Sequence, residues 1–323
     1  MNFYLAPMEG LTGYIYRNAH NTFFNHIDKH FSPFISANQC GSLKAKELND
    51  ILPENNQKLV LIPQILTNNA KDFIHITKKI ELLGYKEVNL NLGCPSRTVV
   101  SKNKGSGFLA KTKELDIFLE EIYSQSVTKI SVKTRIGKNQ PEEFYELIEI
   151  FNKYPIEELI IHPRTQTDYY NNKPNIGIFK EALNLSKNPI CYNGDVFTVK
   201  DYKEFAAGFP GVSSLMIGRG VLANPGLTRD IKNNIKLEKD LLKEFHDKLY
   251  NDYKKILYGD TNVLYKMKGL WFYMISVFSN NEKYIKRIRK AVKLYDYDEV
   301  ISSLFREQDL LEDYEKNLVF KVW

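Results

Sequence analysis

One cysteine stands in a turn that would hold a thiol in place. Cys94 lies between Gly93 and Pro95, and these neighbours set the backbone on either side of it. A thiol with an unperturbed pKa of about 8.5 is mostly protonated at neutral pH, so it can act as a general acid. A nucleophilic role would need a lowered pKa and a nearby base, and sequence order identifies no histidine partner. A buried, inert thiol is the alternative, and it is the preferred interpretation for Cys40 and Cys191.

A lysine lies inside a short segment that is rich in β-branched residues. Lys133 falls within residues 130–136, where an ammonium group pointing into an apolar core would be costly. At the end of a strand it could hold a negative charge, and a reduced flavin carries such a charge near N1 and O2. Gln64 and His162 could then hydrogen-bond the polar edge of the ring. A Schiff-base lysine and a lysine in a structural salt bridge are the alternatives.

These residues follow short apolar runs that recur along the first two thirds of the chain. Each run has the length of a strand buried on both faces, and the segments between them show helical spacing of apolar residues. This alternation predicts parallel strands, and eight such units predict an α/β protein with a (β/α)8 TIM barrel. An open doubly wound sheet is the alternative, although no Gly-x-Gly-x-x-Gly follows the first run. The predicted strands are residues 3–6, 31–36, 59–65, 87–92, 129–134, 158–162, 189–192 and 214–217.

Beyond about residue 230 the strand-like runs stop and helical spacing continues alone. We therefore predict a barrel domain over residues 1–235, followed by a small α-helical domain over residues 236–323. One predicted helix carries a basic stretch, which is typical either of an RNA-binding face or of a merely solvated one. The stretch consists of Lys283, Lys286, Arg287, Arg289, Lys290 and Lys293.

Composition excludes several classes of protein. The chain has 323 residues, of which 43% are hydrophobic and 26% charged, as in a folded globular protein. No apolar run is long enough to span a membrane, and residues 3–6 are too short for a signal peptide, so we expect a cytoplasmic protein. Three cysteines without a Cys-x-x-Cys pair argue against a disulfide framework or a zinc ribbon, and we predict no metal site. The net charge of +6 permits a polyanionic partner without requiring one.

Polar residues and glycines gather at the ends of most predicted strands, where TIM barrels carry their chemistry. The last two strands end in Asn193-Gly194-Asp195 and Gly218-Arg219-Gly220. These positions commonly supply a phosphate site in barrels, with glycines that allow close approach of the backbone and an arginine that binds phosphate. They predict a phosphorylated cofactor. Two ordinary glycine turns with a surface arginine are the alternative.

Six motifs, in order along nearly the whole chain, resemble the tRNA-dihydrouridine synthase family, most of all its C-type bacterial branch. The resemblance implies an FMN-binding barrel joined to a helical tRNA-binding domain, and an enzyme that reduces uridine with NADPH or NADH as the reductant. We expect it to act as a monomer. The motifs are Ala-Pro-Met-Glu-Gly at 6–10, Asn-Leu-Asn-Leu-Gly-Cys-Pro-Ser at 89–96, Ser-Val-Lys-Thr-Arg-Ile-Gly at 131–137, His-Pro-Arg-Thr at 162–165, Asn-Gly-Asp at 193–195 and Met-Ile-Gly-Arg-Gly at 216–220.

The resemblance also implies a role for each motif residue. Cys94 matches the proton donor of the family. The segment after it, residues 102–108, is more basic than in many relatives, which could alter the fit of the substrate loop. The other implied roles are Pro7, Met8 and Glu9 along the flavin; Gln64, Lys133 and His162 at its ring; Asn193, Gly194, Asp195, Gly218 and Arg219 at its ribityl phosphate; and Asn91, Arg135 and Arg164 at the uracil and its phosphates.

Three other functions remain open at this point. A flavin barrel that acts on a small molecule, similar to dihydroorotate or dihydropyrimidine dehydrogenases, is disfavoured by the basic C-terminal stretch. A non-catalytic RNA-binding protein is disfavoured by the presence of Cys94 and Lys133. A dihydrouridine synthase that acts on ribosomal RNA would share the same residues.

Overall fold

The computed structural model describes residues 1–36, 43–312 and 314, so Cys40 lies outside the described residues. The chain packs into two compact units. Unit 1 contains Met1–Pro7, Asp28–Asp195 and Phe209–Met216; unit 2 contains Met8–Ile27, Val196–Gly208 and the chain from Ile217 onward. The units interleave along the sequence, and the division into domains at residue 235 stays a prediction.

Unit 1 is built around a sheet of parallel strands in the order β3-β2-β1-β9-β8-β7-β6-β5-β4. Strands β3 and β4 are consecutive in the chain but stand at opposite ends of this order, so the sheet curls into a nearly closed barrel. The predicted TIM barrel is therefore confirmed. The last residue of β9, Ile217, belongs to unit 2, and all other strand residues belong to unit 1. The strands are β1 (Asn2–Leu5), β2 (Lys29–Phe31), β3 (Leu61–Ile62), β4 (Gln64–Ile65), β5 (Glu87–Leu92), β6 (Lys129–Arg135), β7 (Leu159–His162), β8 (Ile190–Tyr192) and β9 (Ser214–Ile217).

The predicted strand over residues 59–65 is two strands in the structure. β3 pairs with β2, and β4 pairs with β5. Pro63 separates them, because proline has no N–H to donate to a neighbouring strand. The carbonyl oxygen of Pro63 accepts the N–H of Asn89 at 2.9 Å. The proline thus divides the run where the chain passes from one neighbour to the other.

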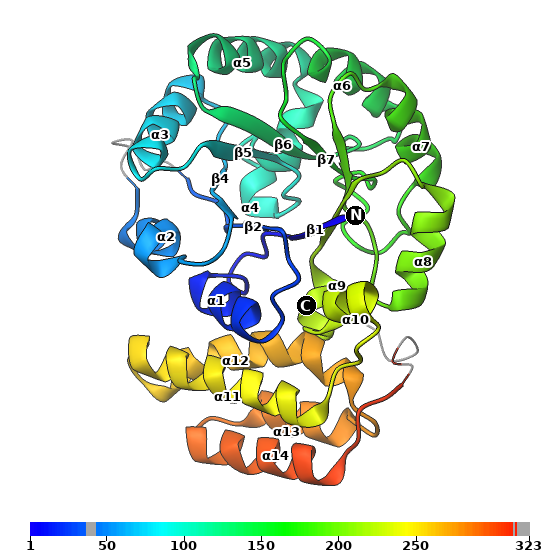
Figure 1. The fold of residues 1–323 in the computed structure, drawn as a ribbon. Coiled ribbons are helices and arrows are strands. Elements are labelled where there is room, and N and C mark those ends of the chain that lie inside the picture. The colour runs from blue at the N-terminus through cyan, green and yellow to red at the C-terminus, as the bar shows by residue number, and fades with distance from the viewer. Residues whose placement is uncertain (37–42, 313, 315–323) are drawn as a thin grey trace. The chain divides into compact units, whose positions relative to one another are not determined.

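Helices alternate with the strands of unit 1 and lie outside the barrel, as Figure 1 shows for α3, α5, α6 and α7. Helix α3 buries Phe73, Ile76 and Ile80, whose spacing of three and four residues places them on one face of the helix. Its first turn is capped by Asn69, whose side chain accepts the N–H of Asp72 at 3.0 Å. The helices are α2 (Ala45–Ile51), η1 (Pro53–Asn55), α3 (Ala70–Leu82), α4 (Arg97–Val100), η2 (Gly105–Ala110), α5 (Thr112–Gln125), α6 (Glu143–Phe151) and α7 (Ile176–Leu185).

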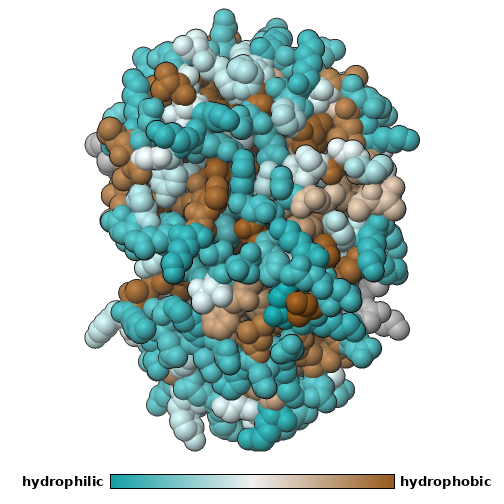
Figure 2. Space-filling view, viewed as in Figure 1, coloured by the Kyte–Doolittle hydropathy of each residue, from teal (hydrophilic) through white to brown (hydrophobic). Residues whose placement is uncertain are grey.

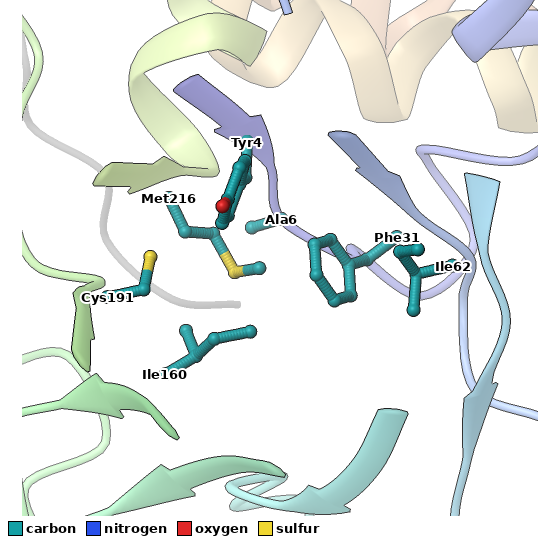
Figure 3. Packing of buried hydrophobic residues seen from close by; sticks show 7 residues of the cluster. All are labelled: Tyr4, Ala6, Phe31, Ile62, Ile160, Cys191 and Met216. Atoms are coloured by element: carbon teal, nitrogen blue, oxygen red, sulfur yellow. The ribbon is translucent and has the colours of Figure 1, made fainter. Parts of the chain in front are cut away.

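Side chains from β1, β2, β3, β7, β8 and β9, or from the residue that follows the strand, pack into one buried cluster. Figure 3 shows the cluster formed by Tyr4, Ala6, Phe31, Ile62, Ile160, Cys191 and Met216. Cys191 is fully buried, as predicted. Burial, and after it the negative charge of Glu158, raises the pKa of the Cys191 thiol. This thiol therefore stays protonated and serves the packing of the core.

Unit 2 is helical, and the predicted helices in the C-terminal part of the chain are confirmed. Helix α1 packs against α11, where the ring of Phe245 meets those of Tyr16 and Phe24 edge-on. The helices are α1 (Tyr14–Phe23), α8 (Val199–Gly208), α9 (Arg219–Ala223), α10 (Leu227–Asn233), α11 (Lys239–Ile256), α12 (Asp260–Met274), η3 (Ile275–Val277), α13 (Glu282–Lys290) and α14 (Leu294–Glu307).

Hydrophilic side chains cover most of the face drawn in Figure 2. Among the described residues, no helix combines the length and the apolar character that crossing a bilayer requires.

A buried hydrogen-bond network ties three helices of unit 2 together. The indole N–H of Trp271 donates to the hydroxyl of Tyr297 at 2.7 Å, and this hydroxyl lies 2.7 Å from His246 Nε2. Burial lowers the pKa of His246, so the ring is neutral and carries a single proton. Its Nδ1 lies 2.8 Å from the carboxylate of Asp247, which can only accept. The proton therefore sits on Nδ1, and Tyr297 donates to Nε2.

We predict that Tyr297→Phe destabilises the protein by ~2–4 kcal/mol, because it leaves both the Trp271 N–H and His246 Nε2 unpaired in a buried site. The matched control is Tyr295→Phe on the same helix. Tyr295 is 75% exposed, and its change should stay within about 0.5 kcal/mol. Urea denaturation of both variants measures the difference, and equal midpoints would contradict the role given to the network.

Candidate functional site

Hydrogen bonds hold every backbone polar group of the turn at Gly93 and Cys94. Asn91 Oδ1 accepts the N–H groups of Gly93 and Cys94 at 3.0 and 2.9 Å. Arg135 Nε donates to the carbonyl oxygen of Gly93 at 3.1 Å. Ser106 donates to the carbonyl oxygen of Cys94 through its N–H at 3.1 Å and its hydroxyl at 2.8 Å. The Cys94 side chain remains partly exposed, so the turn fixes the backbone and still presents the thiol.

The loop after the cysteine packs directly against this turn. Gly105 has a φ of +56°, in the left-handed region that favours glycine. A Cβ at this position would lie 2.8 Å from the carbonyl oxygen of Cys94 and 2.9 Å from a methyl group of Val99. A glycine is therefore required here for two independent reasons, its backbone conformation and the lack of space.

Lys133 lies one strand away from the cysteine, paired with Asn91 where β6 runs beside β5. Its side chain keeps some surface exposure, but the ammonium group lies deep in the protein. This burial, and after it the positive charge of Arg135, lowers the pKa of Lys133 to about 8. Among the described residues no carboxylate forms an ion pair with it. An enclosed cation without a counter-charge suits a ligand that carries negative charge.

Arg135 is fully buried and joins the cysteine turn to the segment after β7. Besides Gly93, its guanidinium donates to the carbonyl oxygens of Thr165 at 2.7 Å and Tyr169 at 2.8 Å. It also stacks over the ring of Tyr170, with 5.3 Å to the ring centre. These contacts engage the guanidinium with the protein itself, and its predicted role at the uracil stays a prediction.

His162, Arg164 and Asp195 form one hydrogen-bonded group in unit 1. The buried guanidinium of Arg164 binds both carboxylate oxygens of Asp195, at 3.0 and 2.5 Å. It also lies 2.9 Å from His162 Nε2. Because arginine only donates, Nε2 must accept, and the proton of a neutral His162 ring sits on Nδ1. Asp195 therefore holds Arg164 in place, and its predicted contact with a phosphate stays a prediction.

Two further predicted residues follow β8. Asn193 donates from Nδ2 to the carbonyl oxygen of Met216 at 2.8 Å, which ties the end of β8 to β9. A Cβ on Gly194 would collide with the hydroxyl and ring of Tyr192, which is itself buried. Only glycine fits at this position in the present arrangement.

Gly218 and Arg219 belong to the structure of unit 2. Gly218 is the N-terminal capping residue of α9, and Arg219 is its first residue. The Arg219 guanidinium lies over the ring of Phe197, 5.2 Å from its centre. The next residue, Gly220, approaches the carbonyl oxygen of Val196 so closely that a Cβ would collide with it. The backbone at Gly220 therefore lies closer to the backbone of Val196 than any residue with a Cβ would allow.

The segment that follows β1 forms a compact turn. The carbonyl oxygen of Met8 accepts the N–H groups of Leu11 and Thr12, both at 3.0 Å. Lys266 of α12 donates to the carbonyl oxygen of Gly10 at 2.7 Å. Glu9 is exposed on this turn, and Pro7 precedes it in unit 1. The predicted roles of Pro7, Met8 and Glu9 along a flavin stay predictions.

Asn89, Gly105 and Ser106 also belong to the site, although no individual role is predicted for them from the sequence. Asn89 had a signal, because it stands two residues before Asn91 in the same predicted strand and so points to the same side. Gly105 and Ser106 belong to the segment 102–108, which stood out only for its basic residues, since the importance of these two comes from a contact with a turn eleven or more residues away. No group of three or more His, Cys, Asp or Glu that could hold a metal ion occurs within residues 1–36, 43–312 and 314.

A TIM barrel with a fixed thiol and an enclosed cation at the carboxyl ends of neighbouring strands has the form of a barrel enzyme. The chain matches the family model "Dihydrouridine synthase (Dus)" over residues 4–318. It therefore belongs to the dihydrouridine synthase family.

Named relatives agree with this assignment. A probable tRNA-dihydrouridine synthase of Helicobacter pylori is 27% identical over 321 residues, covering 93% of each chain. The tRNA-dihydrouridine(16) synthase of Escherichia coli O157:H7 is 31% identical over 255 residues, covering 72% of this chain and 76% of its own.

Solved structures share the fold at low identity. A 2-naphthoyl-CoA reductase has a TM-score of 0.57 at 11% identity, covering 72% of this chain and 50% of its own. Histamine dehydrogenase from Rhizobium sp. 4-9 has a TM-score of 0.54 at 10% identity, covering 72% and 46%. At such identities the likeness concerns the barrel alone.

We predict that Gly105→Ala displaces the Cys94 turn and lowers product formation by about tenfold or more, because the new Cβ meets the carbonyl oxygen of Cys94 at 2.8 Å. Gly84→Ala is the matched control. Gly84 also has a positive φ, +93°, but nothing lies within 4 Å of its added Cβ. Dihydrouridine formed per minute is measured for both variants. Equal losses would show that backbone strain, and not the collision at Cys94, limits activity.

Proposed function

We propose that this protein is a flavin-dependent tRNA-dihydrouridine synthase that saturates the C5–C6 bond of specific uridines. The observation that carries the proposal is the pairing of two features on neighbouring strands. A thiol held by its own backbone follows β5, and an enclosed ammonium group without a counter-charge lies on β6. Relatives that are named as tRNA-dihydrouridine synthases support the choice of substrate.

The residues present fit FMN as the cofactor. The Lys133 ammonium lacks a carboxylate among the described residues, and a reduced flavin ring would bring negative charge to it. Gln64 and His162 are the further ring ligands that we propose. Arg219 would bring a guanidinium to the ribityl phosphate, and Gly194 would leave its backbone open to it because the residue has no Cβ. The residues that we propose for this phosphate are Asn193, Gly194, Asp195, Gly218 and Arg219.

The chemistry requires a hydride at C6 and a proton at C5 of the uracil. A flavin held by these residues, and reduced by NADPH or NADH, would supply the hydride when bound. The Cys94 thiol donates the proton, and the hydrogen bonds of the turn hold the backbone that carries the thiol while the base binds. We propose that Asn91, Arg135 and Arg164 contact the uracil and its phosphates. A uridine within folded RNA must be turned out of its stack before it can reach the thiol.

The basic surface of α13 supports an RNA partner. Two of its cations are neutralised within the protein, since Lys283 pairs with Glu307 at 3.3 Å and Arg287 with Glu299 at 3.1 Å. In the described part of the chain, the exposed Lys286, Lys290 and Lys293 form no ion pair. Their charge is available to a phosphate backbone.

Two tyrosines near this basic surface divide into different roles. Tyr295 is 75% exposed and could stack on a base, whereas Tyr297 is fully buried and belongs to the core of unit 2. We further propose that the protein acts as a monomer in the cytoplasm, where tRNA is found.

We predict that Cys94→Ala abolishes dihydrouridine formation while salt-sensitive binding of tRNA is retained, because the thiol supplies a proton and not affinity. The matched control is Cys191→Ala, which removes the buried thiol of the core and should leave the reaction largely intact. Dihydrouridine is mapped in total RNA from cells that lack this gene and other synthases, and that carry each variant.

Each pattern in the RNA map has a distinct meaning. Loss at one defined tRNA position establishes both the activity and its target. Loss at a ribosomal position would mean that the protein catalyses the proposed reaction but acts on ribosomal RNA. An unchanged map, together with no salt-sensitive tRNA binding, would favour a flavin enzyme that acts on a small molecule.

We predict that Lys133→Met shifts the reduction potential of the bound flavin to more negative values, because the positive charge that favours the reduced ring is lost. An interaction of roughly 2 kcal/mol corresponds to about 40 mV for a two-electron couple. Lys129→Met is the control, since Lys129 lies on the same strand but pairs with Glu157 at an exposed position. A potential that is unchanged in Lys133→Met would remove Lys133 from the flavin site.

A further inference from the structure

A chain of buried side-chain hydrogen bonds leads away from the Cys94 turn into the barrel. Asn91, which accepts the N–H groups of Gly93 and Cys94, donates from Nδ2 to Gln64 Oε1 at 2.7 Å. Gln64 donates from Nε2 to Asn89 Oδ1 at 2.8 Å. The chain continues from Asn89 Nδ2 to the hydroxyl of Ser131 at 3.0 Å, and from this hydroxyl to the carbonyl oxygen of Val88 at 3.4 Å.

The register of the sheet brings these residues to one level. Gln64 of β4 pairs with Asn89 of β5, and Asn89 pairs with Ser131 of β6. Asn91 stands two residues further along β5, and its side chain therefore points to the same side as that of Asn89. Gln64, Asn89 and Ser131 are completely buried, and Asn91 is 6% exposed.

The side-chain hydrogen bonds from Asn91 to Ser131 all have the same direction. In each of them the residue on the side of Asn91 donates and the next residue accepts. Backbone N–H groups can only donate, so Asn91 must turn its oxygen toward Gly93 and Cys94. Its nitrogen is then left to face Gln64, which must offer its oxygen there and its nitrogen to Asn89. The same requirement passes to Asn89 and ends at Ser131, whose hydroxyl can both accept and donate. No amide in the chain can rotate without breaking the bonds on both of its sides.

We infer that Asn89 and Ser131 are positioning residues for Cys94. Neither contacts the cysteine, but together they fix the orientation of the Gln64 and Asn91 amides, and Asn91 fixes the backbone that carries the thiol. The inference that this positioning serves proton donation rests on the proposed function. That Asn89 and Ser131 order the Cys94 turn rests on the hydrogen bonds alone.

The hydrogen-bond chain also limits the donors and acceptors that the Asn91 amide can offer to a ligand. Its oxygen already accepts two N–H groups, and its nitrogen has donated one of two hydrogens to Gln64. Only one N–H remains. Any ligand group that faces Asn91 must therefore be an acceptor, as the carbonyl oxygens of uracil are.

The test compares two substitutions of residues in the hydrogen-bond chain with one substitution of a residue outside it. Asn89→Leu keeps the shape and removes both hydrogen bonds of the central amide. Ser131→Ala removes only the last link and is the milder variant if Asn89→Leu fails to fold. Thr134→Val is the matched control, since its hydroxyl is equally buried on β6 but bonds to the carbonyl oxygen of Arg135, outside the chain.

The first readout is the rate at which iodoacetamide alkylates Cys94 in the flavin-loaded protein, followed across pH by mass spectrometry of the Cys94 peptide. We expect a severalfold change in Asn89→Leu, a smaller change in Ser131→Ala and none in Thr134→Val. Alkylation that is the same in all three variants and in the parent chain would overturn the inference, whatever the fate of the proposed function.

The second readout separates positioning from a general loss of stability. The kcat for dihydrouridine should fall by about tenfold or more in Asn89→Leu, with the KM for tRNA and the flavin content little changed. If the parent chain forms no dihydrouridine at all, the proposed function fails and the alkylation result still decides the positioning role. If kcat falls in all three variants in proportion to their loss of stability in urea, Asn89 and Ser131 are structural and the inference is wrong.

Discussion

The candidate site depends on the hydrogen bonds that fix the backbone between Gly93 and Cys94. Asn91 takes up the N–H groups of the turn, while Arg135 and Ser106 take up its carbonyl oxygens. A thiol that donates a proton to carbon must stand at one place relative to the base, because proton transfer depends steeply on distance. The turn fixes the backbone on both sides of Cys94, which we propose as the proton donor, and Cys94 remains partly exposed.

The barrel makes this possible because β5 is buried on both faces and still carries two asparagines. An amide in such a strand is tolerated only when its donors and acceptors are paired. The flanking strands β4 and β6 supply those partners at the same level of the sheet. Burial therefore keeps these amides in one orientation, since amide groups shielded from water have no alternative hydrogen-bond partners.

Most strand ends and the residues with chemical groups could be predicted from the sequence, because strand length and the spacing of apolar residues report directly on parallel βα units. The bounds predicted for the second strand, residues 31–36, were wrong, since β2 spans Lys29–Phe31. The sequence alone could not show that Asp195 binds Arg164, or that Arg135 is engaged by three carbonyl oxygens, since both depend on how distant loops fold over the strand ends. The break at Pro63 was readable in principle from its missing N–H, but only pairing shows that it closes the barrel.

The balance of charge at this end of the barrel argues that unit 1 is built to receive an anionic or electron-rich group. Arg164 is neutralised by Asp195, and Arg135 spreads its charge over carbonyl dipoles. Lys133 has no such compensation among the described residues, and burial lowers its pKa to about 8. A protein selected for stability alone would place a carboxylate or an apolar residue there, because an uncompensated buried cation is costly. The flavin that we propose as the cofactor would offset this cost, because its reduced ring would bring negative charge to Lys133.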